Sequence, residues 1–323
     1  MGAVSDIVKA GVEPISKFID AVSRGIGCLY EPTKIKKLAA AKASEISIVA
    51  DAIRKNDDLP IIYNRDGVQI DASDYLALAE RANSRLVFQE MRKQQNIEAI
   101  VEKAYREVET FSEVSSEPVD DDWIVRFFNS VEDVSDEKLQ EIWAKLLAGE
   151  IKKPRSSSQR TLDLLKNLSP DEAMLFEKAS VCVLESGAEK YIPDETSLLK
   201  EQGISFRDLF TLSDAGLINL SELTVTSDLS CGDSMIFNDK IVCILKAATD
   251  ESPKSIQFVV RCLTWAGTEI FRALTSDSDQ RVDFALKYFR KLKDEKTNLI
   301  VSAYNVVAFE GNGVRYKKNN LLE

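Results

Sequence analysis

Apolar residues recur every three or four positions at the start of the chain, a spacing that predicts an amphipathic helix over Val4 to Tyr30. Balanced positive and negative charges lie on its other face, and Pro14 is expected to kink it. A helix of this length reaches roughly 40 Å, long enough to cross a bilayer if an assembly hides the polar face. The predicted membrane-facing or oligomer-facing residues are Val4, Ile7, Val8, Val12, Ile15, Phe18, Ile19, Val22, Ile26 and Leu29.

A basic stretch follows this helix, at Lys34, Lys36, Lys37 and Lys42. Cations beside an amphipathic helix favour an anionic membrane surface, so these lysines are candidates for membrane contact. The same residues also fit an amphipathic hairpin packed in a helical domain, with its lysines in solvent. From the residues alone the packed hairpin is favoured, because the first helix carries little aromatic surface and its charges balance.

Turn chemistry and then a long helix are expected next. Pro60 and the Asp66-Gly67 pair predict a loop or small hairpin within residues 57–71. Residues 73–111 contain no Gly or Pro, which predicts one long helix, and a helix of that length favours self-association. Its expected apolar stripe comprises Tyr75, Leu78, Ala82, Leu86, Ile97, Val101, Ala104, Val108 and Phe111.

The central part of the chain returns to helical spacing after a polar, acidic linker. The pattern predicts one helix from Trp123, another capped by Ser135, and two more divided by Ser169-Pro170, a cap followed by Pro at the first helical position. Three carboxylates, Asp120 to Asp122, precede the first of these helices. Acids in that position cap free helix amides far more often than they bind metal.

Strand patterns begin after Tyr191. A short helix ending at Gly216, two strands (MIFNDKIVCILKA and KSIQFVVRCLT) flanking an acidic turn, and the helix WAGTEIFRAL together resemble a winged-helix unit. A final helix over Arg281 to Lys293 and a strand, LIVSAYNVVAF, complete the chain. The expected fold is mainly α with a smaller α+β part.

These patterns divide the chain into five segments. They are an amphipathic helical segment (1–56), a loop with the long helix (57–112), an acidic linker (113–122), a helical module (123–190) and a winged-helix-like α+β domain (191–323).

The composition removes several chemistries. The 323 residues include no histidine, which excludes Ser-His-Asp and Cys-His nucleophiles and His-ligated zinc. No phosphate-binding glycine motif is present, and no pair of acids and lysine has the spacing of a magnesium-dependent nuclease. We therefore expect no enzyme activity, no catalytic or metal residue and no cofactor. The five cysteines (Cys28, Cys182, Cys231, Cys243 and Cys262) are scattered, which favours a reducing cytoplasm.

Charge argues against nucleic-acid binding. Residues 113–323 contain 26 Lys and Arg against 36 Asp and Glu, so most of the net charge of −11 lies there. The helix expected to read DNA carries Arg207 as its only cation, set against Asp208 and Asp214. Nucleic acid is thus an unlikely partner, although local basic patches escape this reasoning.

The central helices carry a family resemblance. DDDWIVRFFNSVEDVSDEKLQEIWAKLLAGEI, followed by RTLDLLKNLSPDEAMLFEKA, resembles a bacterial domain-of-unknown-function family (2806) found around prophages and genomic islands. More faintly, these stretches and GIGCLYEPTKIKK (Gly25 to Lys37) resemble the abortive-infection alpha proteins. The resemblance covers residues 120–180 well and most of the chain loosely. It implies a role in phage defence and transfers no catalytic residue.

These features lead to one hypothesis and one alternative. A cytoplasmic, non-enzymatic defence protein would sense a phage protein, self-associate, and move to the inner membrane, where residues 4–30 would form a pore or otherwise permeabilise it. The alternative is a prophage-linked DNA-binding regulator that works through the winged helix.

Overall fold

The protein is a mixed α+β protein with two compact units, residues 1–162 and 163–323. Its computed structural model describes residues 2–27, 61–64, 67–70, 73–221, 223–230, 233–249, 254–274, 278–310 and 313–322, with side chains of 2–12, 61–77 and 79 left aside. About 54% of the chain is helix and about 21% is strand. The sheet is thus a larger part of the fold than the expected mainly α class, and the winged-helix unit stays a prediction.

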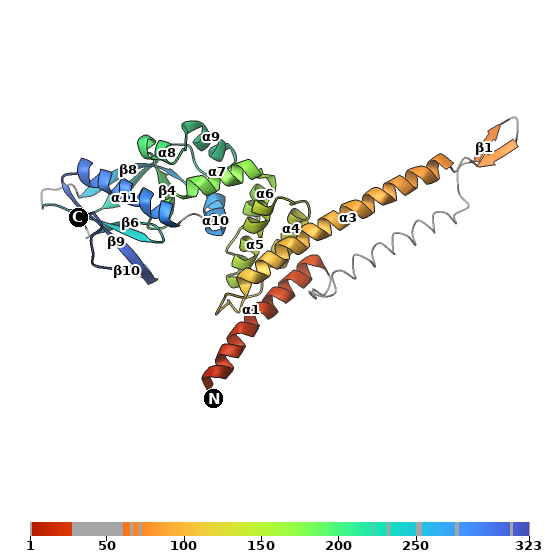
Figure 1. The fold of residues 1–323 in the computed structure, drawn as a ribbon, viewed down its shortest axis with the longest axis horizontal. Coiled ribbons are helices and arrows are strands. Elements are labelled where there is room, and N and C mark those ends of the chain that lie inside the picture. Colours follow the sequence, from red (N-terminus) through yellow and green to blue (C-terminus); the bar gives the residue numbers. More distant parts are fainter. Residues whose placement is uncertain are drawn as a thin grey trace. The chain divides into compact units, whose positions relative to one another are not determined.

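The first unit is built from helices and one small hairpin (Figure 1). The predicted hairpin is present, since β1 and β2 pair antiparallel. The predicted amphipathic helix is also present, with Pro14 inside it. The elements are α1 (Gly2–Ile26), β1 (Ile61–Asn64), β2 (Gly67–Ile70), α3 (Ser73–Val108), α4 (Asp121–Val131) and α5 (Glu137–Lys152), while α6 (Gln159–Asn167) crosses into the second unit.

Aromatic side chains of α4 and α5 form the centre of the first unit. The ring of Phe127 stacks on Trp123 at a centroid distance of 5.3 Å and meets Trp143 edge-on at 5.4 Å. All three residues are buried. Such aromatic contacts add specific geometry to a large apolar burial, so α4 and α5 are fixed against each other.

The long helix α3 packs over only part of its length. Ile100, Val101 and Ala104 are buried, and α3 contacts α5 closely in this region. Toward its N-terminus the predicted apolar stripe is solvent-exposed, with Leu78 at 56% and Leu86 at 47%. The stripe is therefore continuous in sequence but only its C-terminal half is covered by the described residues of the unit. Self-association through the other half stays a prediction.

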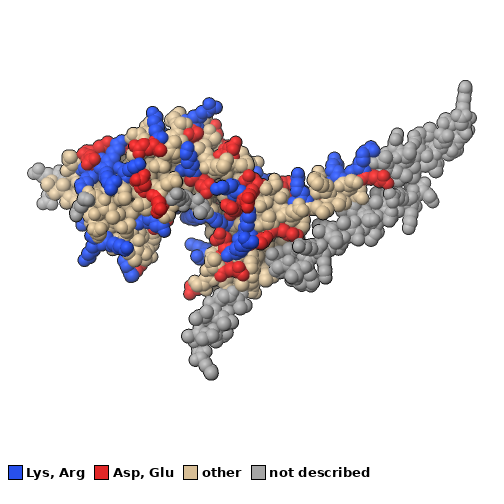
Figure 2. Space-filling model, viewed as in Figure 1, with Lys and Arg blue, Asp and Glu red and all other residues tan. Residues whose placement is uncertain are grey.

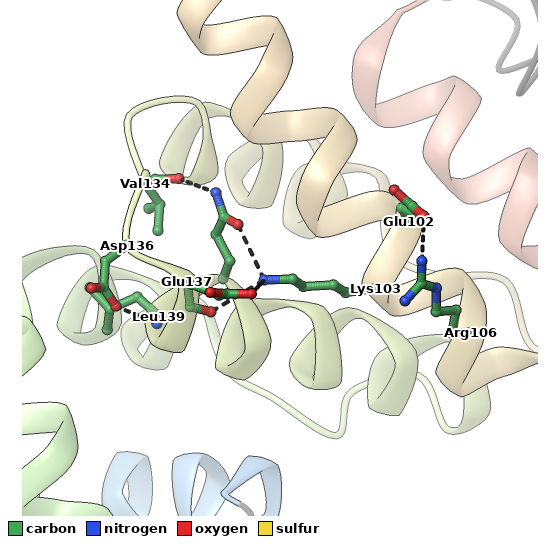
Figure 3. Close-up of polar contacts among 8 residues, drawn as sticks. Glu102, Lys103, Arg106, Val134, Asp136, Glu137 and Leu139 are labelled. Carbon is green, nitrogen blue, oxygen red and sulfur yellow. Dashed lines mark hydrogen bonds and ion pairs between the residues drawn. The ribbon is translucent and has the colours of Figure 1, made fainter.

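Polar contacts complete the α3–α5 interface (Figure 3). The Lys103 ammonium donates to the Glu137 carbonyl at 3.4 Å and to Gln140 Oε1 at 3.3 Å. The α5 N-cap is Asp136, whose carboxylate accepts from the Leu139 amide at 2.9 Å. The prediction that Ser135 caps this helix was wrong by one residue, because either side chain fits the cap chemistry and only the backbone path decides between them.

The second unit contains several helices and one antiparallel sheet of eight strands. The strand order in the sheet is β10-β9-β7-β6-β3-β4-β8-β5 (Figure 1). Its helix α7 begins as predicted, with Ser169 as the cap, Pro170 at the first position, and a capping box to Glu172. The elements are α7 (Pro170–Ser180), β3 (Leu184–Ser186), β4 (Glu189–Pro193), α8 (Thr196–Glu201), α9 (Phe206–Asp214), β5 (Leu223–Asp228), β6 (Ser234–Phe237), β7 (Ile241–Ala247), β8 (Ser255–Cys262), α10 (Trp265–Ala273), α11 (Ser278–Glu295), β9 (Leu299–Glu310) and β10 (Gly313–Tyr316).

Two strand predictions need correction. MIFNDKIVCILKA is a hairpin of β6 and β7, not one strand, because the buried Asn238 side chain accepts hydrogen bonds from the Lys240 and Ile241 amides and closes a turn. The following strand, β8, does not pair with β7. Instead β7 pairs with β6 and β9, while β8 pairs with β4 and β5.

A buried carboxylate organises the chain after α5. Glu150 is 1% exposed and accepts hydrogen bonds from the amides of Arg155, Ser156 and Ser157 at 2.5, 2.9 and 3.1 Å. The hydroxyls of both serines donate to it as well. The carboxylate thus satisfies backbone groups of a turn in which Arg155 has a φ of 65°.

We predict that Glu150→Gln destabilises the first unit by about 1–3 kcal/mol, because an amide nitrogen would face these donors and leave some of them unsatisfied. Urea unfolding followed by tryptophan fluorescence measures this, since Trp123 and Trp143 are buried in this unit. The matched control is Glu141→Gln on the exposed side of the same helix, with a change below about 0.5 kcal/mol. Equal effects of the two substitutions would contradict the role assigned to Glu150.

Candidate functional site

The predicted membrane face of α1 is partly buried in the first unit. Phe18 and Val22 are fully buried, and Ile15, Ile19 and Ile26 are half-buried. The side chains of Val4, Ile7, Val8 and Val12 lie outside the described residues, as do Leu29, Lys34, Lys36, Lys37 and Lys42. The described half of the amphipathic face therefore faces the protein core, as in the packed alternative drawn from the sequence.

Close packing holds the C-terminal half of α1 against α4. A Cβ atom added at Gly25 would lie 2.3 Å from the Phe128 ring and 2.8 Å from Ile124. Only a glycine allows the two helices to approach this closely. On α1, the Phe18 ring also meets Tyr105 of α3 edge-on at 5.7 Å.

The predicted acidic linker also contacts α1. The Lys17 ammonium donates to the Ser115 carbonyl at 2.8 Å, and the Arg24 guanidinium donates to the Val119 carbonyl at 3.1 Å and pairs with Asp121. Residues 113–122 thus lie inside the first unit, where they connect α3 to α4 and run along α1. We call the contacts of Lys17 and Arg24 with this segment the α1 clamp.

Charge holds neither Lys17 nor Arg24 strongly in the α1 clamp. Burial lowers the pKa of Lys17, and nearby carboxylates, first Glu150, only partly offset that effect. A cation whose pKa is lowered in the folded state is held in a site that disfavours its charge. Arg24 is about one third exposed, so its ion pair with Asp121 stabilises the clamp only weakly.

Asp120 has the structural role that the sequence predicted. Its carboxylate accepts a hydrogen bond from the Trp123 amide at 2.9 Å and caps α4. Asp121 and Asp122 occupy the first turn of the same helix, where their negative charge interacts favourably with the positive end of the helix dipole. Within the residues that the structure describes, no group of acids or cysteines is placed to hold a metal ion.

In the second unit, a short turn joins α8 to α9 (Figure 1). Gly203 has a φ of 66° in the turn, and Lys178 of α7 donates to its carbonyl at 2.6 Å. Ser205 and Asp208 form a capping box at the start of α9, and hydrogen bonds from Ser205 lower the pKa of Asp208. These local interactions fix the direction in which α9 leaves the turn.

The outward face of α9 is aromatic. Phe206 is 66% exposed and Phe210 is 49% exposed, and their spacing places both rings on one side of the helix. Arg207, the cation expected on the DNA-reading helix, is exposed near them. The sequence pattern indicated Arg207 but not the exposure of the two rings, because apolar residues on a short amphipathic helix are normally assigned to its buried face.

Charges of both signs are interspersed on the described part of the face shown in Figure 2. Mixed charge gives little long-range attraction for a polyanion. Among the described helices, none has the length and apolar character needed to span a membrane.

One comparison with known proteins found a match. The model of a protein family described as "Protein of unknown function (DUF2806)" matches residues 80–287. No curated protein and no solved structure matches the chain. The family resemblance predicted from the central helices is thereby confirmed, while the fainter one to abortive-infection alpha proteins stays a prediction.

We predict that Gly25→Ala loosens α1 from α4, although alanine normally stabilises a helix interior by roughly 0.5–1 kcal/mol relative to glycine. The new methyl group would clash with the buried Phe128 ring. Limited trypsin digestion should cut within α1 faster than in the unsubstituted protein. Gly149→Ala is the matched control, because its added Cβ meets only Ser156 Oγ at 3.7 Å. Faster cleavage in both variants would contradict this packing role.

Proposed function

We propose that this chain, which belongs to the DUF2806 family, is a non-enzymatic phage-defence protein whose N-terminal helix is kept inactive until a partner binds. In this proposal the second unit recognises a phage protein, the chain self-associates, and α1 leaves the first unit to disrupt the inner membrane. The α1 clamp is the observation that carries the proposal.

Packing of α1 against the other helices of the first unit hides the residues that a membrane would otherwise bind. Phe18, Ala21 and Val22 are fully buried in the first unit, and they lie on the same face as the apolar positions nearer the N-terminus. Releasing them costs about 25 cal/mol for each Å² of apolar surface exposed to water. Insertion of the same surface into a bilayer recovers that free energy, so a small bias from a bound partner is enough to shift the balance.

The aromatic face of α9 supports a protein as the partner. Phe206 and Phe210 present apolar rings to solvent beside a single cation, and aromatic side chains of this kind are common centres of protein interfaces. Sequence-reading helices instead direct several Arg, Lys, Asn or Gln side chains at base edges.

A winged-helix form of the second unit remains part of the proposal. The α8–α9 turn and the antiparallel pairing of β5 with β8 support it, with an additional bridge between Ile218 and Leu263. The β6–β7 hairpin would then be an insertion between the two wing strands.

The succession of α8, a short turn and α9 also supports a second candidate, the DNA-binding regulator. Its weakness is the charge of α9, where Arg207 is set against Asp208 and Asp214. Binding to duplex DNA at low salt that disappears in Arg207→Glu would favour this candidate over the defence protein.

Loosening the clamp should raise membrane binding. We predict that Lys17→Met with Arg24→Met increases co-sedimentation with phosphatidylglycerol-containing vesicles severalfold, because both contacts to residues 113–122 are lost. Arg81→Met with Arg85→Met, which removes the same charge from the exposed surface of α3, is the control and should bind no more than the unsubstituted protein. An increase shared by both double variants would show a charge effect and contradict the clamp.

Deletion of residues 1–12 tests the effector role in cells. This truncation retains Phe18, Ala21 and Val22, so the first unit keeps its packing. We predict loss of both phage protection and dye entry during phage challenge, with an unchanged thermal unfolding transition of the purified protein. Undiminished protection after this truncation would eliminate the membrane mechanism. Undiminished protection after deletion of residues 1–30 would eliminate it as well.

A further inference from the structure

Four aromatic side chains share one face of the sheet, near the edge that β10 forms. Phe237 of β6 lies opposite Val242 of β7, which lies opposite Tyr304 of β9, so the three occupy one row across the sheet. Tyr316 of β10 lies opposite Val306, two residues beyond Tyr304 on the same face. The rings of Tyr304 and Tyr316 are 4.7 Å apart at an angle of 31°.

A β-bulge brings the fourth ring to this face. The β9–β10 register shifts between Arg315 and Tyr316, so that Val307 has no opposite residue. Without the shift, Phe309 would point to the other side of the sheet, because side chains alternate along a strand. With it, the Phe309 ring lies 5.6 Å from that of Phe237. We call Phe237, Tyr304, Phe309 and Tyr316 the aromatic platform.

The platform is open to solvent. Phe309 is 47% exposed and Tyr316 is 38% exposed, and Phe237 and Tyr304 are half-buried. Ile300, on the same face by register, is also exposed. Flat rings left in solvent next to each other are suited to stacking with planar groups of a ligand.

Cations surround the platform although the chain as a whole is acidic. Lys317 and Lys318 directly follow Tyr316 and are exposed, whereas Arg315 pairs with Glu310 and lies on the opposite face by register. Lys246 lies close enough to the platform for Tyr316 and Tyr304 to add to the rise in its pKa, which the Asp233 carboxylate mainly causes. The Lys240 carbonyl accepts from the Val306 amide, so the backbone of Lys240 lies beside β9.

The acids near these cations form exposed ion pairs. Lys246 pairs with Asp233 at 2.9 Å, Lys240 pairs with Asp239 at 3.9 Å, and Arg315 pairs with Glu310. Each of these side chains is about half exposed, so the ion pairs stabilise the fold little. Their cations can therefore bind other anions.

We propose that the aromatic platform binds single-stranded nucleic acid, with bases stacked on Tyr316 and Phe309 and phosphates bound by Lys246, Lys317 and Lys318. Stacking and cations together are the two features that sequence-independent binding of single strands requires. A duplex hides its base faces and cannot use the rings. This site is separate from α9 and from the α1 clamp, and the inference does not depend on the proposed function.

Fluorescence anisotropy with labelled 20-nucleotide oligo(dT) and oligo(U) tests the proposal on the full-length protein. We expect binding at 50 mM salt that weakens steeply as salt rises, and weaker binding of a duplex of the same length. Comparison of the two oligonucleotides distinguishes DNA from RNA as the source. Absence of binding to both at 50 mM salt would overturn the proposal.

Substitutions of exposed residues separate stacking from charge. Phe309→Ser with Tyr316→Ser should weaken binding at least about tenfold. Trp265→Ser, which removes a ring that is 78% exposed on α10 of the same unit, is the control and should leave affinity unchanged. Lys246→Ala with Lys317→Ala and Lys318→Ala should reduce the salt dependence while preserving the rings, which keeps the test decisive if the serine variant fails to fold.

A labelled polyglutamate peptide tests the competing class of ligand. Binding of this peptide, with the oligonucleotides unbound, would assign the platform to an acidic protein and overturn the nucleic-acid proposal. Equal oligonucleotide affinity in the platform variant and the Trp265→Ser control variant would overturn it as well.

Discussion

The close approach of α1 to α4 is the constraint on which the first unit depends. Gly25 lets Phe128 and Ile124 of α4 lie against the α1 backbone, and Phe128 in turn meets Phe127 at the aromatic centre. The N-terminal helix is therefore a structural part of the unit in this state. Any effector role requires a change of packing, and the polar contacts with residues 113–122 are where such a change can begin.

The second unit has a different organisation. Its sheet register places buried residues such as Cys243 and Tyr191 in the interior. Aromatic residues are exposed on two separate surfaces, one on α9 and one at the β9–β10 end of the sheet. Phe206 and Phe210 lie beside charges of both signs, Arg207 and Asp208, whereas Lys246, Lys317 and Lys318 accompany Tyr316 and Phe309. This difference in surroundings is the reason that we propose different partners, a protein for α9 and a single-stranded nucleic acid for the platform.

Local chemistry made several elements predictable. Ser169 and Pro170 start α7 as expected, and the acids before Trp123 include the α4 cap, because caps depend on a few neighbouring residues. The β6–β7 hairpin was missed for a different reason. Its turn is closed by Asn238, whose side-chain amide also donates to the Arg281 carbonyl far along the chain. The local spacing of apolar residues does not indicate such a contact.

The sequence by itself determined the helices of the first unit, the α+β character of the second and the DUF2806 family, because periodicity, caps and family motifs are properties of neighbouring residues. Only the tertiary structure decided which apolar residues are buried. Phe18 and Phe206 occupy similar amphipathic helices, yet the first is fully buried and the second is 66% exposed. Burial depends on which distant element packs against a helix, and the pattern within the helix cannot specify that partner.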